Sequence, residues 1–254
     1  MKLSFMTFMC PNWKIEKIVR FARESGYDGV EIRVDAGHRH GISARSSKAE
    51  RRYVRELFEE FGVDVSSIAT SVQFSFPDPT KRKKNLEDAK KNIDLASDLG
   101  AKVVRIFAGR NVPKMTDEVA QYIADAFTEV GEYAETLNVC PLLETLHDIV
   151  QSADDAFKVI KNVRTENFGI LWNHSEIDIR SFNLLKNYIR HFHVHEEVLN
   201  PENRNIAKLA RMMKTVNFQG YVSLEIIKGV DLPEKLLIET SKRLRSQIEE
   251  AYTK

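Results

Sequence analysis

The chain has 254 residues, of which 43% are hydrophobic and 30% charged, the composition of an ordinary globular protein long enough for a sizeable core. Its 38 basic and 37 acidic side chains leave a formal net charge of +1, so neither nucleic acid nor an anionic membrane is an expected partner. No apolar run reaches membrane-spanning length. The only cysteines are Cys10 and Cys140, which favours a reducing, cytoplasmic location.

Eight apolar runs of β type recur along the chain, and a segment of helical periodicity follows each of them. The expected strands are Leu3–Phe8, Gly29–Val34, Val63–Ala69, Lys102–Phe107, Val139–Thr145, Phe168–Trp172, Ile189–His195 and Tyr221–Ile227. The expected helices are Ile15–Ser25, Lys48–Phe61, Lys84–Leu99, Asp117–Leu137, Ala153–Val163, Ile179–Lys186, Ile206–Val216 and Glu234–Tyr252.

This alternation predicts an α/β fold, because parallel strands are joined through helices by right-handed crossovers. Eight such units in a chain of this length fit one (β/α)8 TIM barrel, a single domain over residues 1–254. An open doubly wound sheet is the alternative. The segment Met9–Asn12 is not the glycine-rich turn that usually follows the first strand of such a sheet.

Local signals mark where several of these elements begin. Gly26, Gly100 and Gly220 lie between a helix and the next strand, where we expect them to adopt the left-handed conformation that ends a helix. Asp231 and Pro233 are the expected first residues of the last helix. The basic run 81–84 is expected just before or at the start of the third helix, as a solvated or mobile segment.

The strand assignment also predicts where the cysteines lie. Cys10 follows the first expected strand, whereas Cys140 stands at the start of the fifth. They should therefore lie toward opposite ends of the barrel, too far apart for a disulfide bond.

Three of the seven histidines fall within five residues of the seventh expected strand: His191, His193 and His195. Alternation along a strand places all three on one face. Histidine is the commonest side-chain ligand of metals in proteins. One face of this strand can therefore hold a metal ion while the other face packs.

Polar residues also stand at the ends of three other expected strands. Glu144, Asn173 and Glu225 lie at or near the carboxyl ends of the fifth, sixth and eighth strands. The carboxyl ends of barrel strands converge on one rim, which carries the active site in enzymes of this fold. A buried carboxylate without a partner is costly. Together with His193, these residues predict one divalent-metal site at the rim.

Five segments carry a resemblance to a known family: Tyr27–Arg33, Leu95–Gly109, Leu142–Thr145, Gly169–Asn173 and Gly220–Glu225. In this order and spacing the chain resembles, over nearly its whole length, the sugar phosphate isomerase/epimerase family. These are the xylose isomerase-like barrels, which also include type 2 AP endonucleases.

The resemblance implies one divalent ion held by a glutamate, an aspartate, a histidine and a second glutamate. By position these ligands are Glu144, Asn173, His193 and Glu225. It also implies that Glu144 and Glu225 are the catalytic residues, which move protons at the carbon next to a carbonyl through an enediolate. An oxygen-rich set with one histidine suits manganese, magnesium or cobalt and is compatible with zinc.

The chain departs from the family pattern at three places. Asn173 stands where an aspartate is expected, which removes one negative charge although an amide oxygen still coordinates hard cations. Glu176 replaces a histidine three residues later, and His174 is the candidate substitute. The pair His195–Glu196 replaces a lysine and an aspartate.

Further side chains are candidates for binding substrate at the same rim. Glu31 and Arg33 share one strand face, and the alternatives for Glu31 are an ion pair with Arg33 or a place near the substrate. His38 and His147 follow strands in rim loops. The complete set of expected substrate-binding residues is His38, His147, His174, His195, Glu31 and Arg105.

The function predicted from these features is isomerisation or epimerisation of a sugar, a sugar phosphate or a polyol. A dehydratase of the inosose or dehydroshikimate type shares the first proton abstraction and stays open, as does a sugar-binding barrel without turnover. An endonuclease is disfavoured, because Ala69–Gln73 and Phe107–Gly109 lack the histidines of the three-metal family members. The expected partner is a small sugar or polyol, with a homo-oligomer compatible with the family.

Overall fold

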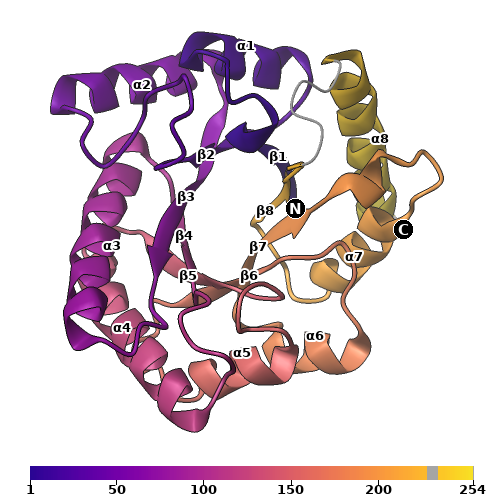
Figure 1. Cartoon of the computed structure of the whole chain (residues 1–254). Helices are drawn as coiled ribbons and strands as arrows, with labels where there is room; N and C mark the ends of the chain where they lie inside the picture. The colour runs from indigo at the N-terminus through magenta and orange to yellow at the C-terminus, as the bar shows by residue number, and fades with distance from the viewer. Residues whose placement is uncertain (228–233, 254) are drawn as a thin grey trace.

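Eight parallel strands close into a barrel in the computed structural model, which describes residues 1–227 and 234–253 (Figure 1). Each strand pairs with its neighbours in sequence, and β8 pairs with β1. The strands are β1 (Lys2–Met6), β2 (Gly29–Arg33), β3 (Asp64–Gln73), β4 (Val103–Phe107), β5 (Cys140–Glu144), β6 (Gly169–Trp172), β7 (Ile189–Val194) and β8 (Tyr221–Leu224).

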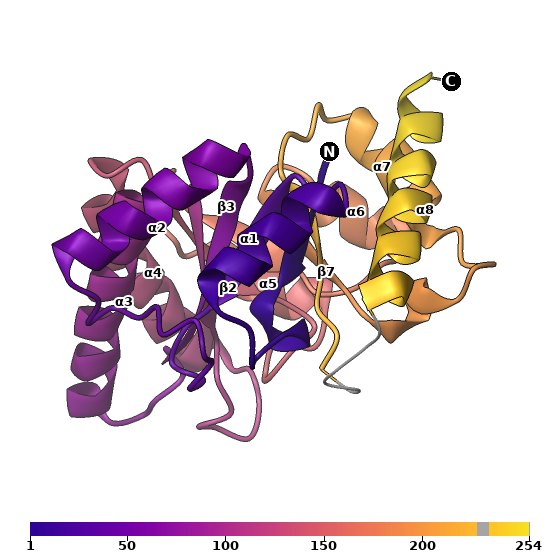
Figure 2. The same ribbon diagram turned by 90° about the horizontal axis from the view of Figure 1, so that it is seen from above.

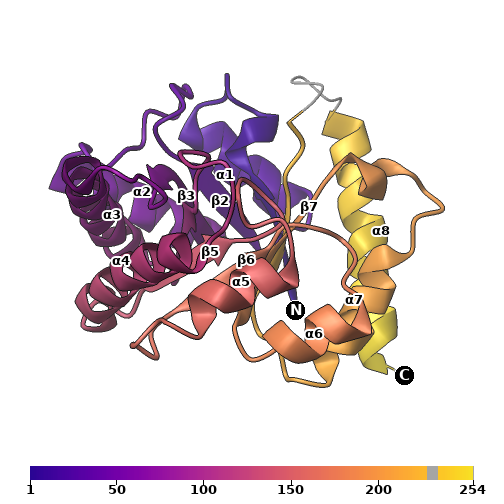
Figure 3. The same ribbon diagram turned by 60° about the horizontal axis from the view of Figure 1, so that its bottom comes forward.

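Helices alternate with these strands and form a ring outside the barrel (Figure 1). They are α1 (Ile15–Glu24), α2 (Lys48–Phe61), α3 (Pro79–Leu99), α4 (Asp117–Glu135), α5 (Ala153–Ile160), α6 (Ile179–Leu185), α7 (Asn205–Lys214) and α8 (Glu234–Thr253), with short 3-10 turns η1 (Thr7–Met9) and η2 (Glu196–Leu199). Figures 2 and 3 show the ring from two other directions, with α7 and α8 side by side. The predicted (β/α)8 barrel is confirmed. Within the described ranges, no helix combines the length and apolar character needed to cross a bilayer.

The third helix begins earlier than the sequence predicts. Pro79 occupies its first turn, and the side chain of Asp78 accepts a hydrogen bond of 2.8 Å from the backbone N–H of Thr80. This cap satisfies a free N–H at the helix start. The basic run 81–84 therefore lies within α3 and not in a loop. The expected helix start at Asp231 and Pro233 lies outside the described residues.

The last two strands are shorter than expected, which places two polar residues just beyond them. β7 ends at Val194 and β8 at Leu224. The N–H of Glu225 still donates to the carbonyl of Val194, at 2.9 Å. His195 and Glu225 therefore lie just beyond the sheet at the rim, and the backbone N–H of Glu225 stays bonded to β7.

The core lies between the sheet and the ring of helices. Leu3 and Phe5 of β1 are fully buried, and the Phe5 ring lies 5.9 Å from that of Phe21 in α1 and 4.8 Å from that of Tyr27. The residue between them, Ser4, is also fully buried. Because neighbouring side chains of a strand face opposite ways, Ser4 points into the barrel, and polar side chains of other strands occupy the same interior.

Two irregularities in strand pairing lie beside the interior polar residues. The register between β2 and β3 shifts between Val30 and Glu31, and the register between β6 and β7 shifts so that Leu171 pairs with His191. Such bulges redirect side chains and are common beside functional sites. Here they help to set the direction of Glu31 and of the β7 histidines.

The three glycines before strands act in two different ways. Gly26 and Gly100 have positive φ, 76° and 81°, as predicted. The prediction is wrong for Gly220, because Asn217 adopts the left-handed conformation (φ 52°) after α7. At Gly220 an added Cβ would overlap the carbonyl oxygen of Arg190. This glycine is needed because β7 and β8 approach closely.

A Gly220→Ala substitution should therefore lower the free energy of unfolding by about 2 kcal/mol or more, the cost of overpacking. Gly62 is a matched control, since its φ is 61° and no atom would lie within 4 Å of an added Cβ. Gly62→Ala should cost only about 1 kcal/mol, from backbone strain. Urea unfolding measures both variants, and equal losses would contradict the close approach.

The two cysteines are free, Cys10 buried and Cys140 partly buried. This confirms that they form no disulfide bond with each other.

Candidate functional site

Glutamates and histidines from four parts of the sheet meet inside the barrel. Glu31 comes from β2, Glu144 ends β5, His191 and His193 lie on β7, and Glu225 follows β8. All five are at most 6% exposed. We call these five residues the central cluster. Because burial of isolated charges is costly, the members of the cluster must compensate one another.

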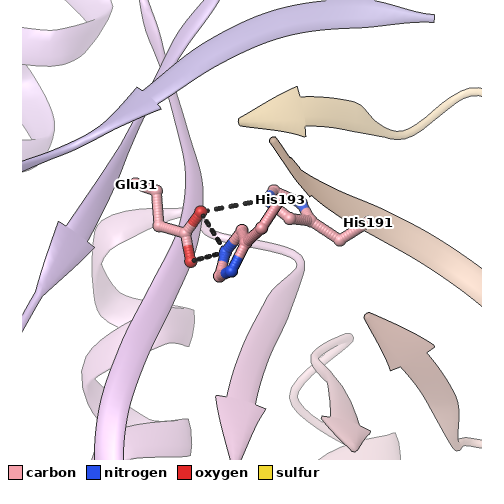
Figure 4. A group of neighbouring side chains, drawn as sticks. All are labelled: Glu31, His191 and His193. Atoms are coloured by element: carbon pink, nitrogen blue, oxygen red, sulfur yellow. Dashed lines mark hydrogen bonds and ion pairs between the residues drawn. The ribbon is translucent and has the colours of Figure 1, made fainter. Parts of the chain in front are cut away.

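His193 contacts all three carboxylates of the cluster. Its Nδ1 lies 3.0 Å from Glu225 Oε2 and 3.2 Å from Glu144 Oε1. Its Nε2 lies 3.0 Å from both carboxylate oxygens of Glu31 (Figure 4). Carboxylates only accept hydrogen bonds when ionised, so both ring nitrogens donate and His193 is an imidazolium here.

The electrostatics of the cluster agree with this protonation. Burial alone lowers the pKa of His193, but Glu31 and Glu225 raise that pKa well above its ordinary value of 6.5. Burial alone raises the pKa of Glu31, but His193 and His191 bring that pKa well below 4.5. Burial alone raises the pKa of Glu225, but His193 outweighs this effect and lowers that pKa to about 2. Glu31, Glu225 and His193 are therefore ionised at neutral pH.

Glu31 also holds the second histidine of β7. The Nε2 of His191 lies 3.0 Å from Glu31 Oε2 (Figure 4). The alternative ion pair between Glu31 and Arg33 is wrong. The guanidinium of Arg33 donates instead to the carbonyl of Ala69, at 3.2 Å, and to Ser71 Oγ, at 2.6 Å. The sequence predicts that Glu31 faces the barrel interior, but it does not identify the distant histidine that Glu31 contacts.

Arg105 of β4 lies against the other side of Glu144. Its Nε is 3.5 Å from Glu144 Oε2, and Arg105 is 1% exposed. One guanidinium nitrogen donates to the carbonyl of Thr70 at 2.8 Å, and the group lies 3.8 Å from the centre of the Phe107 ring. These contacts fix the direction of Arg105. The second oxygen of Glu144 makes no hydrogen bond with any described residue.

Asn173 and His195 form a contact at the edge of the cluster. Asn173 is 8% exposed, and its Oδ1 lies 2.7 Å from His195 Nε2. His195 Nδ1 lies 3.0 Å from the carbonyl oxygen of Glu225. A carbonyl only accepts, so Nδ1 carries a proton. Asn173 is therefore held beside His195 and next to the backbone of Glu225.

His147 lies at the rim beside Arg105. Its ring stacks on Phe107 with centroids 5.0 Å apart, and its Nδ1 is 3.1 Å from Asp148 Oδ1. The contact with the carboxylate of Asp148 raises the pKa of His147 above its ordinary value. Phe107 thus separates a rim histidine from the buried arginine, and both side chains border the same side of the cluster.

His38 and His174 lie apart from the central cluster. His38 Nδ1 is 3.4 Å from Thr7 Oγ1, in the loop that follows β2. His174 is exposed, and its Nδ1 accepts a hydrogen bond of 3.0 Å from the N–H of Glu176. Among the described residues, neither histidine contacts a member of the cluster.

The cluster fits a divalent cation. Single donor atoms of Glu144, His193 and Glu225 lie within 4.8 Å of one another, and a second such group is Glu31, His191 and His193. The first group lies at the rim, and one oxygen of its Glu144 has no hydrogen-bond partner among described residues, although it lies 3.5 Å from Arg105 Nε. Two carboxylates and one imidazole are a donor set that manganese, magnesium, cobalt and zinc accept.

Comparison with known families gives one match that covers most of the chain. The model of a family described as "Xylose isomerase-like TIM barrel" matches residues 19–247. L-ribulose-5-phosphate 3-epimerase UlaE of Shigella boydii is 28% identical over 134 residues, 50% of this chain and 47% of that protein. The match thus spans about half the length of either protein.

Solved structures of similar fold cover nearly all of the chain. An L-ribulose 3-epimerase superposes with a TM-score of 0.80 at 17% identity, over 99% of this chain and 96% of that one. The IolI protein with a bound zinc atom gives 0.80 at 19% identity, over 99% of each chain. The 3-keto-D-glucoside 4-epimerase YcjR of E. coli gives 0.77 at 16% identity, over 97% and 99%. These likenesses show a shared fold.

The charges of the cluster predict how metal-free stability depends on pH. Glu31 and Glu225 have lowered pKa values in the folded state. Their contribution to the free energy of unfolding is therefore full above pH 4.5, their ordinary pKa, and is lost as the pH falls toward the lowered values. His193 has a raised pKa, so its contribution is full below 6.5 and is lost as the pH rises through the raised value. Urea unfolding with a chelator, from about pH 4 to about pH 9, should give maximal stability between these limits. Equal stability at all pH values would contradict the ionised cluster.

Proposed function

This chain belongs to the xylose isomerase-like TIM-barrel family, and on that basis we propose that it is a divalent-metal-dependent isomerase or epimerase of a sugar, a sugar phosphate or a polyol. The observation that carries the proposal is the buried group of Glu144, His193 and Glu225 at the rim. Such a concentration of buried charge is expected at a functional site rather than in a structural core. The activities of UlaE and of the L-ribulose 3-epimerase support the same reaction class.

In this proposal the ion is held by Glu144, Asn173, His193 and Glu225. His193 contributes Nδ1, the nitrogen that lies between Glu144 and Glu225. The Nδ1 proton is the one that a cation replaces. Glu31 accepts from Nε2 and so fixes the ring orientation, as carboxylates behind metal-binding histidines do.

The two glutamates carry the proton transfers. A bound divalent ion would polarise the substrate carbonyl and favour the enediolate. Glu225 would accept a proton from the neighbouring carbon as a general base. Glu144 exchanges a proton on the other side of the substrate. Transfer of a proton from protonated Glu144 to the opposite face of the same carbon, which leaves Glu144 ionised and Glu225 protonated, would give epimerisation. Return of the first proton from Glu225 to the carbonyl carbon, with the neighbouring hydroxyl proton passing to the former carbonyl oxygen, would give isomerisation.

Other rim residues would bind and orient the substrate. Arg105 is fixed against Glu144, where its positive charge favours the negative charge that develops on the substrate oxygens. His147 and His195 border the cluster on either side and offer polar atoms to hydroxyl groups. His38, His174 and Glu31 complete the proposed set, with Glu31 acting through His193.

One observation favours a second candidate function. Asn173 contributes an amide where a carboxylate would bind a cation more tightly. A barrel with weak metal affinity would bind a sugar without turning it over. Dehydration of an inosose or of dehydroshikimate remains a variant of the main proposal, because it begins with the same proton abstraction.

The first test measures exchange of the substrate proton for deuterium. Glu144→Gln and Glu225→Gln should each reduce exchange at the carbon next to the carbonyl by about 100-fold or more, the range for lost acid–base catalysis. Proton NMR in D2O with manganese follows ketopentoses, ketohexoses, their phosphates, inososes and dehydroshikimate. A product double bond identifies a dehydratase.

Glu118→Gln on the exposed face of α4 is the matched control and should retain normal exchange. Near-normal exchange in Glu144→Gln or Glu225→Gln would contradict the proposed mechanism. Sugar binding without exchange in the wild-type protein would favour the binding-only barrel.

A second test addresses Asn173. Asn173→Asp should tighten manganese binding by about tenfold, because it adds one negative charge to the ligand set. Isothermal calorimetry measures the affinity. Asn183→Asp makes the same charge change on exposed surface of α6 and should leave the affinity unchanged. Equal tightening in both variants would show a general charge effect, and no change in either would remove Asn173 from the ligand set.

A further inference from the structure

We propose that the amino-terminal mouth of the barrel, at the opposite end from the rim that carries Glu144 and Glu225, is a second binding site for a small anionic metabolite with an apolar or ring-shaped body. A cavity of about 680 Å³ opens there. It is lined by the first residues of β1, β3, β4, β7 and β8 and by loops that lead into several of them. This volume lies within the range of roughly 300–1,000 Å³ found for small-molecule sites.

Positive charge dominates the described lining of the cavity. Its cations are Lys2, Lys102, Lys186 and Arg190, whereas its one carboxylate among the described residues is Asp64. Asp64 already lies 2.8 Å from the ammonium of Lys2 and accepts a hydrogen bond from the Tyr221 hydroxyl. The carboxylate is therefore neutralised within the wall.

Three of these cations form no salt bridge with another described residue and can therefore interact with a bound anion. The salt bridges of the described residues include none formed by Lys102, Lys186 or Arg190. Lys186 makes only a long contact of 3.4 Å with Asn183 Oδ1, and Arg190 donates to backbone carbonyls. Unpaired cations around a concave surface attract an anion and hold it by charge-assisted hydrogen bonds.

The inner end of the cavity carries buried polar atoms. Ser66 is 2% exposed and His191 is fully buried, and both line the cavity. Ser66 Oγ and His191 Nδ1 have no hydrogen-bond partner among the described residues. A buried hydroxyl and a ring nitrogen of this kind are suited to the polar groups of a bound molecule.

Apolar residues give the cavity its walls. Gly29 lets two lining residues pack closely, because atoms of Tyr221 and Ser66 would lie 2.9 and 3.1 Å from an added Cβ. Val103, Ile189 and Phe218 supply apolar wall. Cations at the mouth, apolar sides and a polar inner end together match an anion that carries an apolar or ring-shaped body.

Isothermal calorimetry tests the site with three probes: ribose 5-phosphate for a phosphate, 4-hydroxybenzoate for a carboxylate, and ribose as the neutral control. At least one anion should bind once per chain, and ribose should not bind at this site. The double variant Lys102→Ala/Lys186→Ala should weaken anion binding by about tenfold or more, from the loss of charged contacts. Amide hydrogen exchange of residues 186–191 and 216–221 should slow on binding.

Two controls separate this site from the rim. Glu225→Gln alters the central cluster and should leave anion binding at the mouth unchanged. Lys83→Ala/Lys84→Ala removes the same charge from the exposed start of α3 and should also leave it unchanged. Binding that is lost in either control and kept in the Lys102→Ala/Lys186→Ala variant would overturn the proposal. So would the absence of saturable binding of both anions up to about 10 mM. None of these readouts depends on turnover, so failure here is distinct from failure of the proposed reaction.

Discussion

The structure depends on one buried ring, the imidazole of His193, whose two nitrogens face three carboxylates. Each carboxylate inside the barrel would be costly without it, and the ring would lose its charge without them. Glu31, Glu144 and Glu225 come from β2, β5 and the end of β8. The sheet must therefore close with these strands in one register, and the bulge beside Glu31 together with the close approach at Gly220 serves that geometry.

The barrel was predictable because its signals are local. Alternation of apolar runs with helical periodicity recurs in every unit, and strand ends identify Glu144, Asn173 and Glu225 as rim residues. Contacts across the barrel carry no such signal. The sequence shows Glu31 and Arg33 on one strand face, which suggests an ion pair, but the bulged register directs Glu31 to the histidines of β7. The left-handed conformation predicted for Gly220 is wrong, because a glycine needed for close approach looks the same in sequence as one needed for positive φ.

The two ends of the barrel are linked by His191. Its Nε2 contacts Glu31, which in turn contacts His193 at the rim. Its other nitrogen, Nδ1, has no hydrogen-bond partner among the described residues, and His191 lines the cavity at the amino-terminal mouth. A continuous chain of polar side chains therefore runs along the barrel axis. That cavity depends on the sizes of interior side chains from several strands, which is why no single segment of sequence reveals it.

The central cluster also constrains how the chain reaches its folded state. Glu31 and His193 are 162 positions apart in sequence, and Glu225 is more distant still. Loops of this length close slowly, and contacts so far apart form late. A growing chain that has made β2 but not β7 holds an acid without its counter-charge, and burial of that strand edge is then unfavourable. We therefore expect the central cluster to form together with closure of the barrel, late in folding.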